Sequence, residues 1–337
     1  MKTGAPIWIK NKVVLIALTL ATLVGLSFIV PLLVPFRESL AEYLGSIWWA
    51  ILLGLLIGGA VDHYVPDEMI SHLLARKKKR TIFTAVVLGF LLSACSHGIL
   101  ALGIELHKKG AATSSVIAFL LASPWANLPL TIMLFGFFGS GALFIILAAL
   151  LVGINTGFIF QVLEKRGWVE SNTNKANPEG DGAVVVEIRK WFRSLRDSDE
   201  SLADGLRGTW NGAVSLGNMV MWWILLGIGL ASLAGAYVPH VFFQNYLGSS
   251  FLGLLATLFV ATVLEVCSEG SAPMAFELFR QTGALGNSFV FLMAGVATDY
   301  TEIGLLWSNV GRRAALLLPI VTVPQVILLG WLANVWL

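Results

Sequence analysis

Two short motifs contain the residues of this chain that are best suited to chemistry. Cys95-Ser96-His97-Gly98 and Cys267-Ser268-Glu269-Gly270 hold the only two cysteines, and each motif lies inside a long apolar segment. A thiolate is a soft ligand for Cu(I), Zn and related ions, and imidazole is a borderline ligand. If the two thiols and His97 converged, they would form a metal or soft-solute site, with Glu269 as a titratable neighbour. The competing interpretation is that each cysteine is a small buried hydrophobic residue.

The second motif is a displaced copy of the first. A shift of 172 residues, from Cys95 to Cys267, also places Asn127 opposite Asp299. At nearly the same offset two further pairs agree, Trp49-x-Ile51-Leu52-Leu53-Gly54 with Trp222-x-Ile224-Leu225-Leu226-Gly227, and Tyr64-Val65-Pro66 with Tyr237-Val238-Pro239. The sequence therefore predicts a duplicated protein whose halves each place one thiol at an equivalent point.

The composition predicts an all-α integral membrane protein. Apolar residues make up 57% of the 337 residues and charged residues 12%, about half of what a soluble domain carries. No Asp, Glu, Lys or Arg occurs in residues 110–163 or 214–264. Since about 20 apolar residues cross a bilayer, each of these stretches holds about two spans.

The apolar segments divide the chain into four parts. Residues 1–38 are expected to hold an N-terminal transmembrane helix (13–36), and 39–163 the first permease repeat, with spans at 44–61, 81–106, 111–138 and 142–163. Residues 164–210 form a polar connection whose stripe at 184–195 predicts an amphipathic helix on the membrane or on the bundle. Residues 211–337 form the second repeat, with spans near 212–237, 248–266, 286–306 and 314–336.

Three of these spans are interrupted by residues that break helices. The two cysteine motifs interrupt two of them, and Ser123-Pro124-Trp125-Ala126-Asn127-Leu128-Pro129 places two prolines where an undisturbed helix cannot hold both. Residues 296–302 are the counterpart of this segment in the second half. Irregular backbone at membrane depth is tolerated where it is buried in protein or lines a wet cavity, so these breaks are candidate walls of a binding site.

Two topologies fit the pattern. Nine simple crossings would make the halves parallel. If each cysteine segment is instead a re-entrant hairpin, seven crossings remain, the halves are inverted and the broken helices meet at the midplane. The second arrangement puts His107-Lys108-Lys109, the long connection and Arg312-Arg313 on the same side as the basic run 76–80. The positive-inside rule favours it, with that side in the cytoplasm.

Acidic residues within apolar segments are functional candidates, because charge in a bilayer is costly. Glu269, Asp299 and Glu302 are the predicted proton-coupling residues. Glu105 and Glu277 occupy equivalent positions near segment ends, where we expect interfacial salt bridges. Substrate contacts are predicted for both cysteine motifs and Asn127: Cys95, Ser96, His97, Gly98, Asn127, Cys267, Ser268, Glu269 and Gly270.

Several functional classes lack their signals. The chain has no phosphate-binding Gly-x-x-x-x-Gly-Lys-Ser/Thr loop, zinc-protease helix or Gly-x-Ser-x-Gly elbow. We therefore expect no ATPase in this chain, no cofactor and no nucleic-acid partner, and transport driven by an ion gradient or by a separate motor protein.

The motifs resemble a family of predicted permeases that includes the organoarsenical efflux permease ArsP. Such proteins have a Cys-Ser-Cys-Gly-type motif, a Lys/Arg-Gly-Ala turn and Phe-Leu-x-x-Ser-Pro-x-x-Asn. The counterparts here are residues 95–98, Lys108-Lys109-Gly110-Ala111 and 119–127, and the second-half stretch 265–273 is also similar. The resemblance implies a multi-pass efflux permease of the inner membrane, with relatives acting on trivalent organoarsenicals or soft metal ions. His97 stands where the family has its second cysteine, which puts a three-thiolate arsenic site in doubt.

These observations predict gradient-driven export of a small soft solute through a site built from the two repeats. One alternative is a permease for a small anion or sulfur compound, bound by half-helix N-termini with incidental cysteines. Another is an intramembrane enzyme that uses His97 and Glu269 as acid and base. The expected partners are the solute and the lipid bilayer, and a homo-oligomer is left open.

Overall fold

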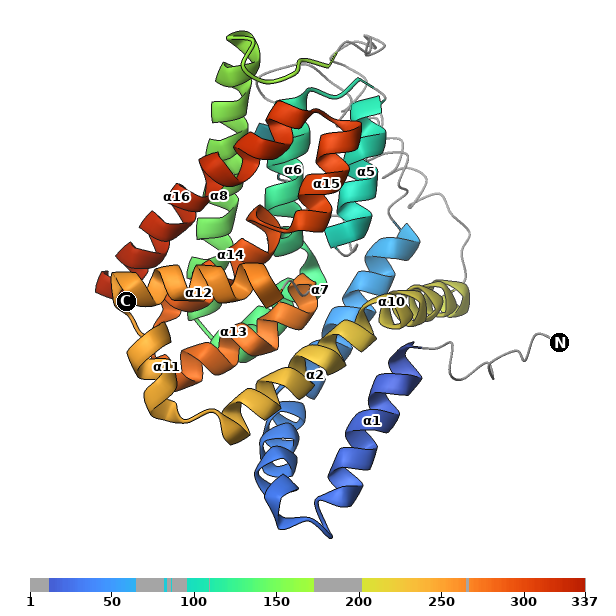
Figure 1. The fold of residues 1–337 in the computed structure, drawn as a ribbon. Coiled ribbons are helices and arrows are strands. Elements are labelled where there is room, and N and C mark those ends of the chain that lie inside the picture. Colours follow the sequence, from blue (N-terminus) through green and yellow to red (C-terminus); the bar gives the residue numbers. More distant parts are fainter. Residues whose placement is uncertain are drawn as a thin grey trace, which may run out of the picture.

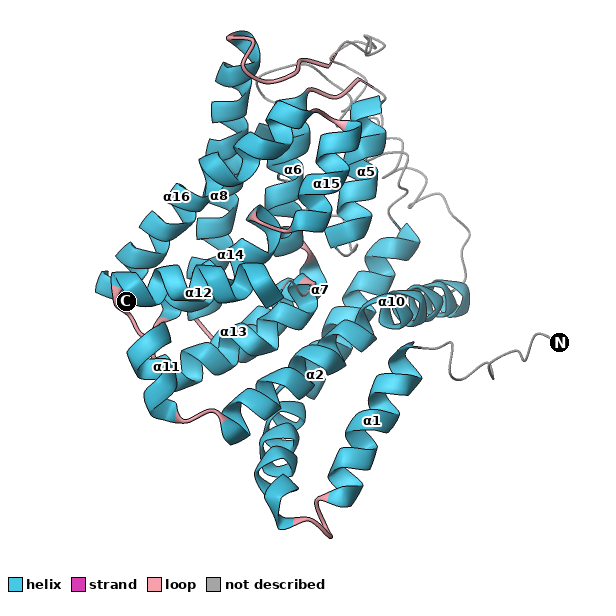
Figure 2. Ribbon diagram, viewed as in Figure 1, coloured by secondary structure: helices cyan, strands magenta, loops and turns pink. Residues whose placement is uncertain are grey.

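The computed structural model describes residues 12–64, 82–83, 86, 96–108, 110–172, 202–264 and 267–336. All the regular elements in these ranges are helices, as the sequence predicted (Figures 1 and 2). They are α1 (Lys12–Leu26), η1 (Pro31–Leu33), α2 (Val34–Tyr64), α5 (Ser96–Lys108), α6 (Thr113–Ala126), α7 (Leu128–Phe138), α8 (Gly141–Lys165), α10 (Leu202–Tyr237), α11 (His240–Leu247), α12 (Phe251–Leu264), α13 (Ser268–Thr282), α14 (Leu285–Ala297), α15 (Tyr300–Asn309) and α16 (Arg312–Trp336).

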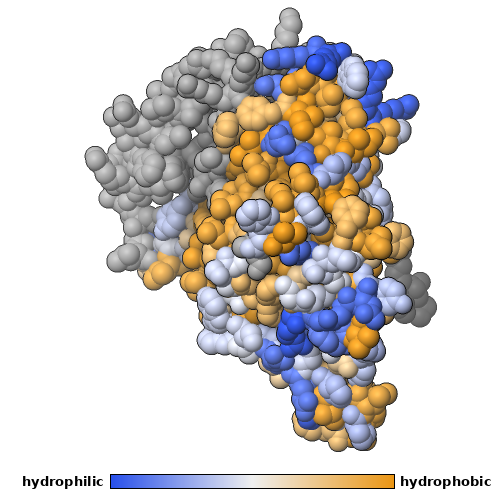
Figure 3. All heavy atoms as spheres, turned by 90° about the vertical axis from the view of Figure 1, so that its left-hand side faces the viewer, coloured by the Kyte–Doolittle hydropathy of each residue, from blue (hydrophilic) through white to orange (hydrophobic). Residues whose placement is uncertain are grey.

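The helices have the length and composition of a membrane bundle. Among the described residues, five helices can cross a bilayer, or up to seven if each of two bent pairs is one span. Figure 3 shows polar surface near both ends of one side of the molecule, with mainly apolar surface between them. The protein is therefore a multi-pass membrane protein, and the predicted fold class is confirmed.

The predicted first span, residues 13–36, is not one continuous helix. Helix α1 ends at Leu26, and after a turn the 3-10 helix η1 leads into α2 at Val34. Pro31 and Pro35 explain this division, because a proline ring fits the start of a helix and not its interior. At 15 residues α1 is about 22 Å long, shorter than the roughly 30 Å of hydrocarbon that a perpendicular span must cross.

The second half also begins earlier than predicted. Helix α10 starts at Leu202, inside the stretch expected to be a polar connection, and runs for 36 residues. The predicted amphipathic helix at 184–195 lies outside the described residues. Helix α10 packs along α2, where a Cβ on Gly59 would lie 2.3 Å from the backbone nitrogen of Ala213. Only glycine permits this approach, as is common where helices pack in membranes.

The predicted breaks at the Pro-rich segment and near residue 299 are present. Helices α6 and α7 meet at Asn127 with a bend of 48°. Helices α14 and α15 are separated at Thr298 and Asp299. In both cases the break lies within an apolar stretch long enough to cross the membrane.

Helices α5 and α13 begin near the middle of the molecule and run toward opposite ends (Figure 1). The α5 end carries basic residues from distant segments, and there the Arg313 side chain donates to the Gly167 carbonyl at 3.1 Å. The α13 end lies beside the start of α2, where Arg280 pairs with Glu42 at 2.7 Å. By the positive-inside rule, we call the first the inner end and the second the outer end.

Candidate functional site

Glu269 is the centre of the site, in the first turn of α13. Its side chain is buried, with the residue 3% exposed. The Cys267 thiol donates to Glu269 Oε2 at 2.5 Å, and the Ser268 hydroxyl donates to the same oxygen at 3.2 Å. From the other half of the chain, Asn127 Nδ2 donates to Glu269 Oε1 at 3.5 Å. A buried carboxylate is thus held by a thiol, a hydroxyl and a carboxamide.

A small cavity opens beside this carboxylate between α2, α7, α10 and α13. Its polar lining residues are Asn127 and Glu269, and the rest are apolar: Ile51, Leu55, Pro129, Leu130, Met133, Leu216, Val220 and Ile224. Its volume is about 20 Å³, enough for about one water molecule. A larger solute would require these helices to separate.

Helix α10 fixes the position of the α13 N-terminus. A Cβ on Gly227 would lie 2.1 Å from the carbonyl oxygen of Gly270, the residue after Glu269. The two backbones are therefore in direct contact. Gly227 is the counterpart of Gly54 in the predicted repeat. A Cβ on Gly54 would lie 3.1 Å from the Pro129 backbone. Both glycines thus allow a long helix to approach a broken one.

Asn127 and Asp299 have the same local role at the two breaks. Asn127 Oδ1 accepts a hydrogen bond from the Leu130 backbone N–H at 2.9 Å, which caps α7. Asp299 Oδ1 accepts one from the Glu302 backbone N–H at 2.8 Å, which caps α15. Both residues are buried, as is Glu302 at 3% exposed. The side chain of Asp299 is thus used by its own helix, which gives it a structural reason to be present.

Part of the predicted site lies outside the described residues. This part includes Cys95 and the side chains of Ser96 and His97. The backbone of Ser96, His97 and Gly98 forms the start of α5. The structure brings together Asn127, Cys267, Ser268 and Glu269. Within the described ranges, no group of three or more His, Cys, Asp and Glu side chains could hold a metal ion. The proposed ligand set of Cys95, His97 and Cys267 therefore stays a prediction.

Two further polar groups lie next to the α6–α7 break. The Ser123 hydroxyl and the Trp125 indole N–H are buried, and the described part of the chain gives neither a hydrogen-bond partner. Both can donate a hydrogen bond. Unpaired donors are costly when buried, so a site for a hydrogen-bond acceptor near this break would relieve that cost.

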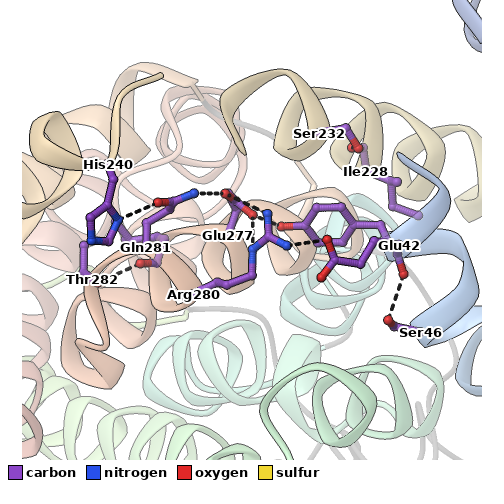
Figure 4. Close-up of polar contacts among 11 residues, drawn as sticks. Glu42, Ser46, Ile228, Ser232, His240, Glu277, Arg280, Gln281 and Thr282 are labelled. Atoms are coloured by element: carbon purple, nitrogen blue, oxygen red, sulfur yellow. Dashed lines mark hydrogen bonds and ion pairs between the residues drawn. The ribbon is translucent and has the colours of Figure 1, made fainter. Parts of the chain in front are cut away.

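A second buried polar cluster lies at the outer end of α13 (Figure 4). Glu277 is 1% exposed and forms an ion pair with Arg280 at 3.0 Å. The Tyr43 hydroxyl of α2 and Gln281 Nε2 also donate to this carboxylate, the latter at 2.6 Å. The predicted salt bridge of Glu277 is therefore confirmed, although it is buried, whereas Glu105 is exposed.

Sequence reasoning missed the partners of Glu277. Arg280 was detectable, because residues three apart on a helix are neighbours. Tyr43 gave no signal, since it is 234 positions away in the sequence. The cluster continues to the surface, where Gln281 Oε1 meets His240 Nδ1 at 2.8 Å (Figure 4).

An aromatic layer lies against this cluster. The Tyr43 ring packs edge-on against Phe137 of α7 and Phe276 of α13, with centroid distances of 6.4 and 6.1 Å. Phe137 and Phe276 stack at 5.0 Å. These rings come from α2, α7 and α13, three of the four helices around the cavity. The outer ends of these helices are thus joined by aromatic contacts and an ion-pair network.

A multi-pass bundle with broken helices and a buried carboxylate beside a small cavity is typical of membrane transport proteins. Residues 36–335 match the model of ArsP_1, described as a predicted permease. The chain therefore belongs to this family of predicted permeases, which confirms the resemblance.

Three relatives agree with this assignment. The UPF0718 protein YcgR of Bacillus subtilis (strain 168) is 25% identical over 281 residues, covering 80% of this chain and 86% of the relative. A putative two-component membrane permease complex subunit of Streptococcus mutans is 21% identical over 259 residues, covering 76% and 80%. The putative permease Rv2963 of Mycobacterium tuberculosis is 26% identical over 256 residues, covering 68% and 59%. No solved structure matches the chain significantly.

Proposed function

We propose that the protein is a proton-coupled permease of the inner membrane that exports a small soft solute, such as a trivalent organoarsenical or a soft metal ion. The observation that carries this proposal is the contact between the Cys267 thiol and the buried Glu269 carboxylate, reached by Asn127 from the other half. The pair offers a soft ligand and a proton acceptor at one point. Cys95 and His97 of the first half would complete the solute site.

The contact suggests how solute and proton are exchanged. When a soft cation binds to the Cys267 sulfur, the thiol proton passes to Glu269, its hydrogen-bond acceptor. The result is a sulfur–solute bond and a neutral carboxyl group. Binding of a monovalent cation therefore leaves Cys267 and Glu269 together without net charge. When the solute leaves, the sulfur takes back the proton if Glu269 still holds it. If Glu269 has already lost that proton, the sulfur must take a new one from solution. If Glu269 loses its proton to the cytoplasmic side before the solute is released outside, sulfur takes its new proton from outside. One proton then enters for each solute exported, which couples export to the gradient.

Inverted halves would provide the alternating access that this exchange needs. Three observations support them: the sequence repeat, the matched caps at Asn127 and Asp299, and the opposite directions of α5 and α13 (Figure 1). In such an arrangement α12 and α13 form a re-entrant hairpin from the outer side, and α5 belongs to its counterpart from the inner side. Such inverted repeats with broken helices are a common plan of secondary transporters.

The cluster of Tyr43, Glu277 and Arg280 is suited to act as the outer gate. It joins α2 to α13 above the cavity, and the aromatic rings of Phe137 and Phe276 lie against it. Separating α2 from α13 would expose the Glu277 carboxylate and release the ring contacts. We therefore assign this conformation to an outward-closed state, which agrees with the small volume of the central cavity.

The anion alternative receives less support from the helix ends. The N-termini of α13 and α15 carry partial positive charge, which an anionic substrate could use. These ends already hold carboxylates, because Glu269 and Glu302 lie in the first turns and Asp299 caps α15. An added anion would meet these carboxylates, whereas a cation or proton would be attracted.

The test is uptake into everted membrane vesicles with and without a pH gradient, using Zn(II), Cu(I), arsenite and methylarsenite. We expect gradient-dependent uptake that is lost in Cys95→Ser/Cys267→Ser and in Glu269→Gln. Asn127→Ala should lower uptake and cost about 1 kcal/mol of stability, because α7 loses its cap. Glu105→Gln is the matched control, since this exposed carboxylate is the repeat counterpart of Glu277 and should leave uptake unchanged.

Each negative result has a distinct meaning. Uptake that survives in the double cysteine variant would refute the thiol as ligand and leave Glu269 as the remaining candidate. Uptake that survives in Glu269→Gln with unchanged pH dependence would refute proton coupling at this residue. Absence of transport for the whole panel would refute soft solutes as the substrate class.

A further inference from the structure

The outward face of α8 carries a polar side chain in an apolar stripe. Leu143, Leu147 and Leu151 are spaced four residues apart and are 54%, 56% and 54% exposed. Asn155 continues the same spacing and is also exposed. Because α8 runs from Gly141 to Lys165, Asn155 is close to the midpoint of the span. A membrane-spanning α8 therefore places a carboxamide at the depth of the hydrocarbon core.

The hydrogen bonding of Asn155 is incomplete. Its Nδ2 donates to Gln325 Oε1 of α16 at 2.8 Å. The Gln325 amide in turn donates to the Thr156 hydroxyl at 3.0 Å and to the Val321 carbonyl at 2.7 Å. In the part of the chain that the structure describes, Asn155 has no hydrogen bond besides the one to Gln325. One N–H and the Oδ1 acceptor are therefore left for another molecule.

Lipid cannot satisfy these groups. Hydrocarbon offers no hydrogen-bond partner, and an unsatisfied polar group there is costly. The neighbouring helix α16 also exposes apolar side chains, with Leu316 and Ile320 51% and 63% exposed. Figure 3 shows that the upper half of this side of the molecule is largely apolar below a polar top.

We propose that the α8 stripe, Leu143, Leu147, Leu151 and Asn155, is the interface between two copies of this chain. The free groups of Asn155 are one donor and one acceptor on the same amide, so two copies satisfy each other. Across a twofold axis, Nδ2 of each Asn155 donates to Oδ1 of the other. A twofold interface brings the same surface of both copies together, which is what a self-complementary amide requires. The other N–H of each amide stays with Gln325 of its own chain.

Cross-linking in native membranes tests the surface. In the Cys95→Ser/Cys267→Ser background, Leu151→Cys should form a disulfide-linked dimer under mild oxidation, because it lies one turn from the proposed axis. Leu52→Cys is the control, since it is 49% exposed on α2 and away from this face. A dimer with Leu52→Cys and none with Leu151→Cys would overturn the proposal, as would cross-linking of Leu151→Cys to a different protein.

Dimer fractions in liposomes, counted by single-molecule photobleaching of labelled wild-type and variant chains, test the amide. Asn155→Leu continues the leucine stripe and should raise the dimer dissociation constant at least about threefold, the typical effect of one interhelical hydrogen bond in a membrane. Gln325→Leu removes the same intrachain bond but keeps the Asn155 amide, so it should leave dimerisation within about twofold of wild type. Equal or tighter dimerisation of Asn155→Leu, or a monomeric wild type, would overturn the proposal.

Discussion

Gly227→Ala should damage the central site without changing any residue that contacts the cavity. The added Cβ would lie 2.1 Å from the Gly270 carbonyl oxygen and 2.8 Å from its carbonyl carbon. Since non-bonded heavy atoms pack at about 3.5 Å, α10 and the start of α13 must separate by roughly 1.4 Å. Glu269 immediately precedes Gly270 and would move with it.

The size of the effect follows from two opposing terms. Alanine is favoured over glycine in a helix interior by about 1 kcal/mol. Overpacking costs about 1–3 kcal/mol, and here the obstacle is backbone, which cannot rotate away. The contact between Asn127 and Glu269 is already at 3.5 Å, so a shift of this size breaks it. We expect a destabilisation of up to about 2 kcal/mol and a large loss of transport.

Gly217→Ala is the matched control on the same helix. There the added Cβ would lie 3.8 Å from a Leu55 methyl group, an ordinary contact, so stability should stay equal or rise. The assay compares thermal unfolding in detergent with gradient-driven uptake in vesicles for both variants. Wild-type stability and uptake in Gly227→Ala would show that α10 and α13 do not touch at this point and would refute the reasoning.

Two more predictions concern the ends of the molecule. Arg280→Ala leaves the buried Glu277 carboxylate without its ion pair and should lower stability by up to about 3 kcal/mol. Glu42→Gln removes only an exposed partner of Arg280 and should lower stability by under about 1 kcal/mol. Equal losses in thermal unfolding would contradict the pairing. At the inner end Glu170 accepts hydrogen bonds from the first N–H groups of α16, at 3.0 and 3.2 Å. Partial burial acts to raise the pKa of Glu170, but these backbone N–H groups outweigh it and lower the pKa below its ordinary value of 4.5. The stabilisation is therefore present above pH 4.5 and lost as the pH falls through the lowered pKa. Glu170→Gln should cost about 1 kcal/mol of stability at neutral pH and nothing in strong acid. A constant difference in stability across pH would contradict this cap.

Local sequence features located the breaks because their causes are local. Pro124 does not end a helix, since α6 continues through it to Ala126. Pro129 lies in the first turn of α7, where a proline fits, so the α6–α7 break was predictable from the sequence. The same is true of Asn127 and Asp299, whose side chains cap the helices that follow them. The division of the predicted first span was missed because the apolar run continues without a charge through Pro31 and Pro35, and hydropathy does not register a turn.

The sequence by itself determined the all-α membrane class, since composition and short-range patterns depend on the local chain, and its motifs identified the permease family. It also identified Glu269 as a functional candidate, because a carboxylate within an apolar segment is costly. Only the tertiary structure decided what surrounds it: Asn127 as a partner, Gly227 against its helix, and a small cavity between four helices. The outer cluster of Tyr43 and Glu277 was likewise set by packing, because helices distant in the chain meet only after the bundle has formed.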